Sequence, residues 1–101
     1  MDNKNLNNEL SLSKIGEKTI LNFNMYDFWE GLDDILKLLE EYYYVNIIEE
    51  LEGPDARIIK IQINEIDYSL QYDSYGAFLK SNSITGDEFL KKIKNKLSKD
   101  K

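Results

Sequence analysis

Strict alternation of apolar and polar residues predicts antiparallel strands in the second half of the chain. Residues 57–63 place three isoleucines on one face of a strand, and residues 66–72 alternate in the same way. Asn64 and Glu65 lie between these runs and leave room for a two-residue hairpin turn, although the favoured glycine is absent. The two runs therefore predict a β-hairpin with one buried face.

Shorter stretches predict further strands and the turns between them. The first two of these strands are predicted from alternation and the third from its β-forming residues, whereas the turns contain glycine, aspartate and the chain's single proline. The additional strands are expected at residues 9–13, 19–23, 44–51 and 77–80, and the turns at residues 14–18, 52–55 and 73–76.

Apolar residues that recur every three or four positions predict a first amphipathic helix after residue 24. Asn24 is the expected N-cap and Asp27 its capping-box partner, while Phe23 and Phe28 occupy the positions of a hydrophobic staple. Gly31 in the early turns costs helix stability, which indicates that another group packs closely there.

A second amphipathic helix is predicted near the C-terminus. Thr85 and Glu88 have the spacing of a capping box, and Ile84 and Phe89 that of a staple. Its apolar stripe consists of Phe89, Leu90, Ile93 and Leu97.

Together these elements follow the order (β)β-α-β-β-β-(β)-α. This order predicts the α+β class: an antiparallel sheet of four to six strands, arranged as a β-meander, with two amphipathic helices mainly on one face. Residues 1–10 are rich in asparagine and lack periodicity, so we expect a mobile polar tail. Residues 11–101 are then expected to form a single domain.

The negative charge is concentrated in one block of the sequence. The net charge is −6, and residues 27–56 contain ten acidic side chains against the single base Lys37. A field of one sign attracts partners of the opposite sign and repels nucleic acid and anionic lipid. The block therefore predicts a basic protein partner.

The residue types argue against an enzyme and against a bound cofactor or metal. Histidine and cysteine are absent, the glycines stand singly, and no spaced calcium loop is present. A carboxylate mechanism that uses Glu49 with Asp73 is the remaining enzymatic alternative.

The chain has no apolar stretch long enough to cross a membrane, and its start lacks the pattern of a signal peptide. We therefore expect a cytoplasmic protein without membrane contact. Lysines follow Asp87, but the acidic molecule as a whole is expected to repel nucleic acid, so these lysines are interpreted as a solvated helix end.

The predicted binding surface combines acids of the first helix and the next strand with nearby tyrosines. Acids in the last helical turn oppose the helix dipole, which suggests selection for something other than folding. Tyr42, Tyr43 and Tyr44 are consecutive, so at least one ring is expected to face solvent as an interface anchor, whereas Tyr68 and Tyr72 are expected in the core. The candidate partner-binding residues are Glu30, Asp33, Asp34, Glu40, Glu41, Tyr43, Tyr44, Glu49, Glu50 and Glu52.

Residues 51–81 contain E-G-P-D-A-R, an apolar strand, a tight turn and a second strand that closes in aspartate. This stretch resembles small bacterial immunity proteins of contact-dependent growth inhibition and related polymorphic toxin systems. The resemblance implies a non-catalytic protein that neutralises a toxin domain, often a basic nuclease, by covering its active site or its substrate groove. Within the stretch, Arg57 is expected to clamp the turn at residues 52–55 or Asp73.

An acidic chaperone of the type III secretion kind is the alternative function, because such chaperones are also small α+β proteins. It would be a homodimer that binds an unfolded effector segment in an apolar groove. An immunity protein is instead expected to be a monomer or weak dimer when free.

Overall fold

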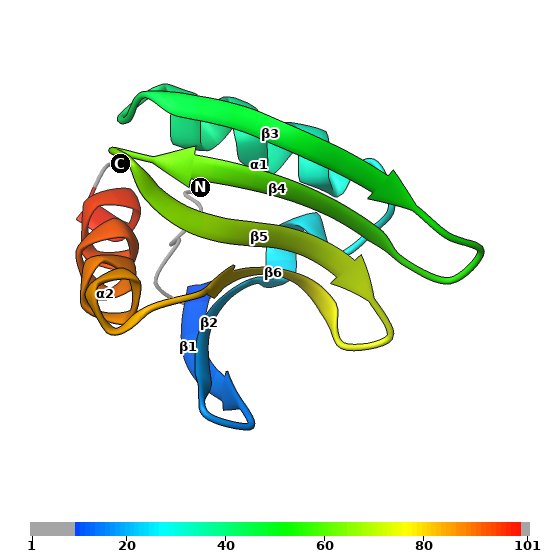
Figure 1. Ribbon diagram of the computed structural model, residues 1–101, viewed down its shortest axis with the longest axis horizontal. Coiled ribbons are helices and arrows are strands. Elements are labelled where there is room, and N and C mark those ends of the chain that lie inside the picture. Colours follow the sequence, from blue (N-terminus) through cyan, green and yellow to red (C-terminus); the bar gives the residue numbers. More distant parts are fainter. Residues whose placement is uncertain (1–9, 100–101) are drawn as a thin grey trace, which may run out of the picture.

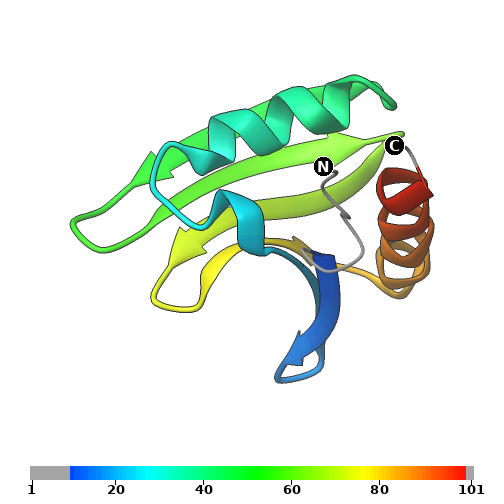
Figure 2. The same cartoon turned by 180° about the vertical axis from the view of Figure 1, so that it is seen from behind.

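A curved antiparallel sheet of six strands carries two α-helices on one face in the computed structural model, which describes residues 10–99 (Figures 1 and 2). The elements are β1 (Leu10–Ile15), β2 (Lys18–Phe23), the short 3-10 helix η2 (Asn24–Tyr26), α1 (Gly31–Glu40), β3 (Val45–Glu52), β4 (Arg57–Ile63), β5 (Ile66–Asp73), β6 (Gly76–Ser81) and α2 (Ile84–Lys99). The strand order is β1-β2-β6-β5-β4-β3, so the last four strands form a meander. The predicted α+β class and element order are confirmed.

The core lies between the helices and one face of the sheet. The isoleucines on one face of β4, Ile59, Ile61 and Ile63, are fully buried together with Tyr68 and Leu70 of β5, as the alternating pattern predicted, and Tyr72 is partly buried against them. The apolar stripes of both helices belong to the same buried cluster. In Figure 2, α1 runs along β3 and β4, while α2 lies across the other end of the sheet. Among residues 10–99 no helix covers the opposite face of the sheet, and the sheet has β3 and β1 as its two edges.

The N-terminal boundary differs slightly from the predicted tail. Leu10, the last residue of that tail, begins β1 and is buried in the core. Residues 1–9, to which the rest of the tail prediction applies, lie outside the described residues.

The β4–β5 hairpin has the two-residue turn that the spacing predicted. Asn64 and Glu65 both have positive φ angles, 52° and 70°. Two consecutive left-handed residues are typical of a type I′ turn, which matches the twist of the flanking strands. Glutamate has no side-chain compensation for this conformation, so Glu65 is held in it by the hairpin.

We expect Glu65→Gly to raise the free energy of unfolding by about 0.5–1 kcal/mol. The left-handed conformation costs an L-residue about 1–2 kcal/mol, and the greater freedom of glycine in the unfolded chain removes part of that gain. Urea denaturation measures the difference. Asn64→Gly is the matched control and should gain less, because asparagine already tolerates this conformation. Unchanged or lower stability of Glu65→Gly would contradict the prediction.

The first helix begins later than predicted, and Asn24 is not its N-cap. Asn24 starts η2 instead, and α1 begins at Gly31 with Glu30 in the N-cap position and no side-chain cap. Asp27 cannot serve as the capping partner because its Oδ1 accepts a hydrogen bond from the backbone N–H of Ala77 at 3.0 Å. Phe28 is exposed rather than stapled. The hydrogen bond between Asp27 and Ala77 therefore joins the segment before α1 to the start of β6.

The second helix also begins at a different cap. Ser83, not Thr85, lies before α2, where its side-chain Oγ accepts a hydrogen bond from the N–H of Gly86 at 2.9 Å. Its carbonyl accepts a second bond from the N–H of Asp87. Ile84 is exposed, so the predicted staple is absent. The serine two residues upstream satisfies the helix N-terminus by the ordinary N-cap mechanism.

Candidate functional site

A buried arginine gathers three of the predicted partner-binding acids. Arg57 begins β4 on the helix-covered face and is only 7% exposed. Its guanidinium donates two hydrogen bonds to Asp33 of α1 at 3.0 and 3.3 Å and two to Glu50 of β3 at 2.7 and 3.0 Å. Glu52 lies 3.6 Å away as a third ion-pair partner. One arginine thus ties the first helix to the edge strand.

Opposite charges hold the cluster together, and its three carboxylates outnumber the single guanidinium, so its net charge is negative. The hydrogen bonds that Arg57 donates to Asp33, and then those to Glu50, raise the pKa of Arg57 above its usual value, although burial opposes them. The three carboxylate side chains remain about half exposed. Three carboxylates around one guanidinium still present negative charge to solvent, in a geometry that the arginine fixes.

Arg57 only partly matches the clamp that the sequence predicted. Glu52 does begin the turn segment, but the principal partners are Asp33 and Glu50, and a fifth hydrogen bond goes to the carbonyl oxygen of Trp29 at 3.1 Å. Asp73 has a local role instead, since its Oδ1 accepts a hydrogen bond from the N–H of Tyr75 at 2.8 Å.

The other acids of α1 do not join this cluster. Asp34 and Glu41 lie on the flank that faces η2, where burial, followed by their negative charges, raises the pKa of the Tyr26 hydroxyl. Glu30 and Glu40 are exposed at the two ends of the helix. The single acidic helix face predicted from the sequence is therefore divided between two sides of α1.

The consecutive tyrosines have different environments. Tyr43 is half-buried, and its ring contacts Phe89 of α2 edge-on at 5.5 Å between centroids. Lys96 of α2 lies over the ring of Tyr42 at 5.7 Å. Tyr44 is 76% exposed and comes directly before β3. Of the two tyrosines in the predicted site, Tyr44 presents its ring to solvent and Tyr43 packs against the second helix.

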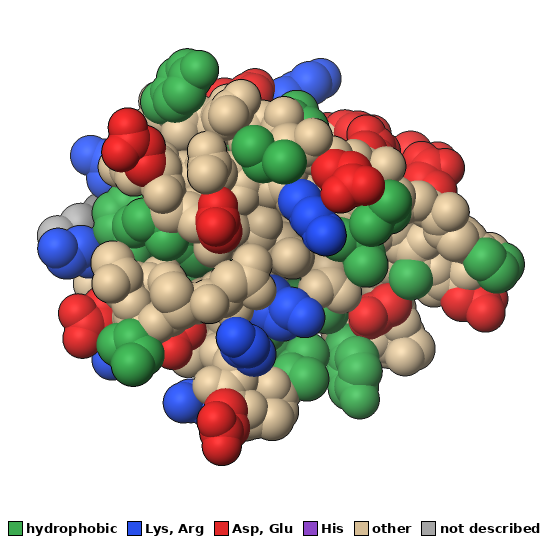
Figure 3. All heavy atoms as spheres, in the orientation of Figure 1, with side chains coloured by type: hydrophobic (Ala, Val, Ile, Leu, Met, Phe, Trp, Pro, Cys, Tyr) green, Lys and Arg blue, Asp and Glu red, His purple; other side chains and the backbone are tan. Residues whose placement is uncertain are grey.

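Strand β3 exposes apolar side chains beside its acids. Ile47, Ile48 and Leu51 are 50%, 55% and 41% exposed. We call the surface formed by these residues and their neighbours the β3 edge surface; it consists of Tyr44, Ile47, Ile48, Glu49, Glu50, Leu51 and Glu52. Figure 3 shows hydrophobic and acidic side chains side by side over β3 on the helix-free face.

A β-bulge distributes these side chains over both faces of the sheet. The register shifts between Ile47 and Glu49, after which Glu50 pairs with Ile59 and Glu52 with Arg57. Glu50 and Glu52 consequently point to the helix-covered face. Glu49 lies opposite Lys60 on the other face, with 3.8 Å between carboxylate and ammonium. Each side of the edge therefore carries both apolar and acidic groups.

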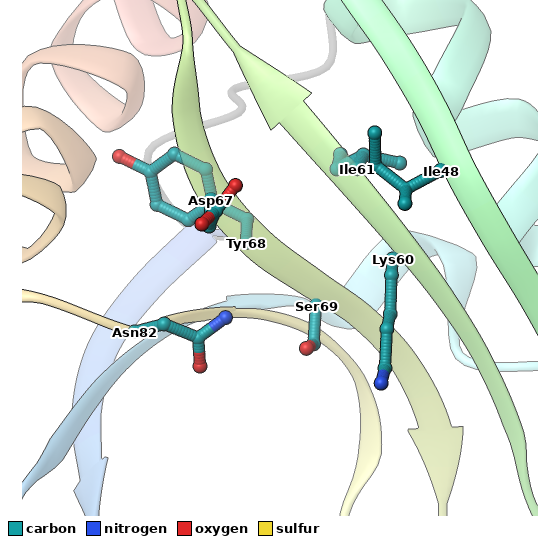
Figure 4. Close-up of a pocket in the computed structure, with 7 residues that line it drawn as sticks. All are labelled: Ile48, Lys60, Ile61, Asp67, Tyr68, Ser69 and Asn82. Carbon is teal, nitrogen blue, oxygen red and sulfur yellow. The ribbon is translucent and has the colours of Figure 1, made fainter.

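A hollow of about 400 Å³ on the sheet adjoins the β3 edge surface (Figure 4). Its lining is formed by Ile48, Lys60, Ile61, Asp67, Tyr68, Ser69 and Asn82. The charged groups already have partners, since Lys60 pairs with Glu49 and Asp67 accepts a hydrogen bond from Gln62 at 2.9 Å. Ile48 belongs to both the hollow and the edge, so the hollow extends the surface onto the helix-free face.

Three apolar members of this surface, Ile47, Ile48 and Leu51, were not among the sequence candidates. The sequence feature that could have indicated their exposure is the run of two isoleucines and two glutamates at residues 47–50. Adjacent residues of the same type break the strict alternation of a strand with one buried face. A bulge is the usual way for a strand to accommodate such a break. This run could therefore have indicated both the bulge in β3 and the exposure of its isoleucines.

Comparisons with known proteins add no relative: no protein-family model, no curated protein and no solved structure matches this chain. Within residues 10–99, neither helix has the length and apolar character needed to cross a membrane.

Proposed function

We propose that this protein is a non-catalytic immunity protein that neutralises a basic toxin domain, such as a nuclease, in the cytoplasm. It acts by binding the toxin stoichiometrically through the β3 edge surface. The observation that carries the proposal is the exposure of four large apolar side chains, Tyr44, Ile47, Ile48 and Leu51, within the acidic part of the chain. Apolar and aromatic anchors surrounded by charge are the usual anatomy of a protein interface.

The charge of the surface supports the same partner. Glu49, Glu50 and Glu52 flank the apolar residues on both faces of the edge. Acids in this arrangement accelerate encounter with a basic protein and set its orientation, while the apolar groups supply affinity once water is excluded. The Arg57 cluster holds Glu50 in place before binding, which lowers the entropy lost on association.

The proposal is tested by capturing the partner from the source cell with the tagged protein and identifying it. We expect a basic protein in a one-to-one complex. Expressed alone, that protein should inhibit growth, and co-expression with this chain should restore it. The affinity of the complex should fall as salt is added, because salt screens the attraction between opposite charges.

Substitutions then test the surface itself. Leu51→Ser and Glu49→Lys should each weaken the complex by about tenfold, which corresponds to about 1.4 kcal/mol. Ile84→Ser and Glu17→Lys are matched controls, because both residues are exposed away from β3. Equal loss in the controls, or none in the β3 variants, would exclude this surface. A stable homodimer by light scattering would instead favour the secretion chaperone.

A further inference from the structure

We infer that the partner is bound by strand addition: an extended basic segment of the toxin pairs with the backbone of β3 and becomes a seventh strand of the sheet. This inference rests on the proposed function, since it specifies how the β3 edge surface takes its partner. It goes further by assigning recognition to main-chain groups as well as to side chains.

The backbone of β3 is available for such pairing. The strand is eight residues long and lies at the end of the sheet, and within residues 10–99 its only strand neighbour is β4. Every second N–H and C=O of an edge strand points away from its neighbour, which makes an open template for another strand. Strand addition uses these groups for affinity and the flanking side chains for specificity.

The flanking side chains define the chemistry of the added strand. Ile47 precedes the bulge, Ile48 is the extra residue within it, and both would contact apolar side chains of the partner. Glu49, Glu50 and Glu52 lie further along and would face lysine or arginine. Opposite charges and apolar pairs across adjacent strands both stabilise pairing. The fitting segment therefore combines basic residues with β-branched apolar ones.

A second copy of this chain fits the same edge poorly. Antiparallel pairing of two β3 strands centred between Glu49 and Glu50 would place Glu49 of each copy opposite Glu50 of the other. Like charges directly opposite each other destabilise a strand pair, and charged side chains with a bulge are common protection against self-pairing. The glutamates therefore disfavour this register of the identical strand, whereas a basic strand gains from the same acids.

The opposite edge of the sheet offers no comparable site. Strand β1 has six residues, and its exposed side chains include Ser11, Ser13 and Lys14. It lacks the apolar and acidic combination of β3, and Lys14 would repel a basic segment. A basic strand is thus expected to choose β3.

The test uses amide hydrogen exchange by NMR with an eight-residue peptide of alternating lysine and valine at millimolar concentration. We expect the β3 amides that point away from β4 to exchange about tenfold more slowly with the peptide bound, while β1 amides stay unchanged. A glutamate–valine peptide and a lysine–valine peptide with a central proline are the matched controls and should have no effect. Glu49→Lys should abolish the protection. Absence of binding, or binding without slower exchange in β3, would overturn strand addition.

The captured toxin, measured in the same way, separates this inference from the proposed function. A one-to-one neutralising complex that leaves the β3 amides fast would retain the proposed function and refute strand addition. If no growth-inhibiting basic partner exists, the proposed function fails even where the peptide protects β3.

Discussion

Replacing Arg57 by alanine is expected to lower the free energy of unfolding by about 3 kcal/mol. The substitution removes five hydrogen bonds and leaves Asp33, Glu50 and Glu52 without their common counter-charge. The carboxylates are half exposed and regain water, which keeps the loss below that of a fully buried ion pair. The guanidinium is itself buried, so its packing is lost as well.

Urea denaturation followed by the fluorescence of Trp29, the single tryptophan, measures this loss. Arg57→Lys is the matched control: it keeps the positive charge but cannot form the planar fork, so it should lose about half as much. A loss below about 1 kcal/mol in Arg57→Ala would show that the cluster behaves as an ordinary surface ion pair.

Gly31→Ala is expected to destabilise the protein by about 2 kcal/mol, against the usual gain from replacing glycine by alanine in a helix. A Cβ atom at this position would fall on the carbonyl oxygen of Tyr26 and 2.8 Å from its carbonyl carbon. That carbonyl cannot move freely, because it accepts a hydrogen bond from the N–H of Phe28 at 2.8 Å in the tight turn before α1.

Thermal unfolding of Gly31→Ala and Gly86→Ala compares two buried helical glycines. At Gly86 the nearest atoms are the hydroxyl oxygens of Ser81 and Ser83, at 2.9 and 3.2 Å. Side-chain tips give way more easily than backbone, so Gly86→Ala should cost less. Equal effects, or a more stable Gly31→Ala, would contradict the close packing between η2 and α1.

The elements that depend on a local sequence pattern were predictable from the sequence. The alternation in β4 and β5 placed both strands and their turn correctly, because a pleated strand with one buried face requires that period. The cost of Gly31 correctly indicated a close contact. The helix starts were not predictable in this way: Asn24 and Asp27 have capping-box spacing, yet the tight turn at η2 and the bond to Ala77 override it.

The candidate site depends on contacts that are distant in sequence. The pattern of acids located the charged region, but it could not show that Arg57 would select Asp33, which is 24 residues away, and leave Asp34 on the other flank. It also could not reveal that β3 is an edge strand, because strand order follows from how the whole chain packs. Exposure of Ile47, Ile48 and Leu51 is a consequence of that order.

Because the Arg57 cluster holds β3 in place, the exposed side chains of this strand can be substituted more freely than the residues of the core. Ile47, Ile48 and Leu51 contribute little to the buried core, whereas the edge strand that carries them is held to α1 through Glu50, Arg57 and Asp33. Under the proposed function, exchanges at these positions would alter which partner is recognised, at small cost to folding. Descendants of a chain with this function would then acquire new specificities through a few substitutions along one edge.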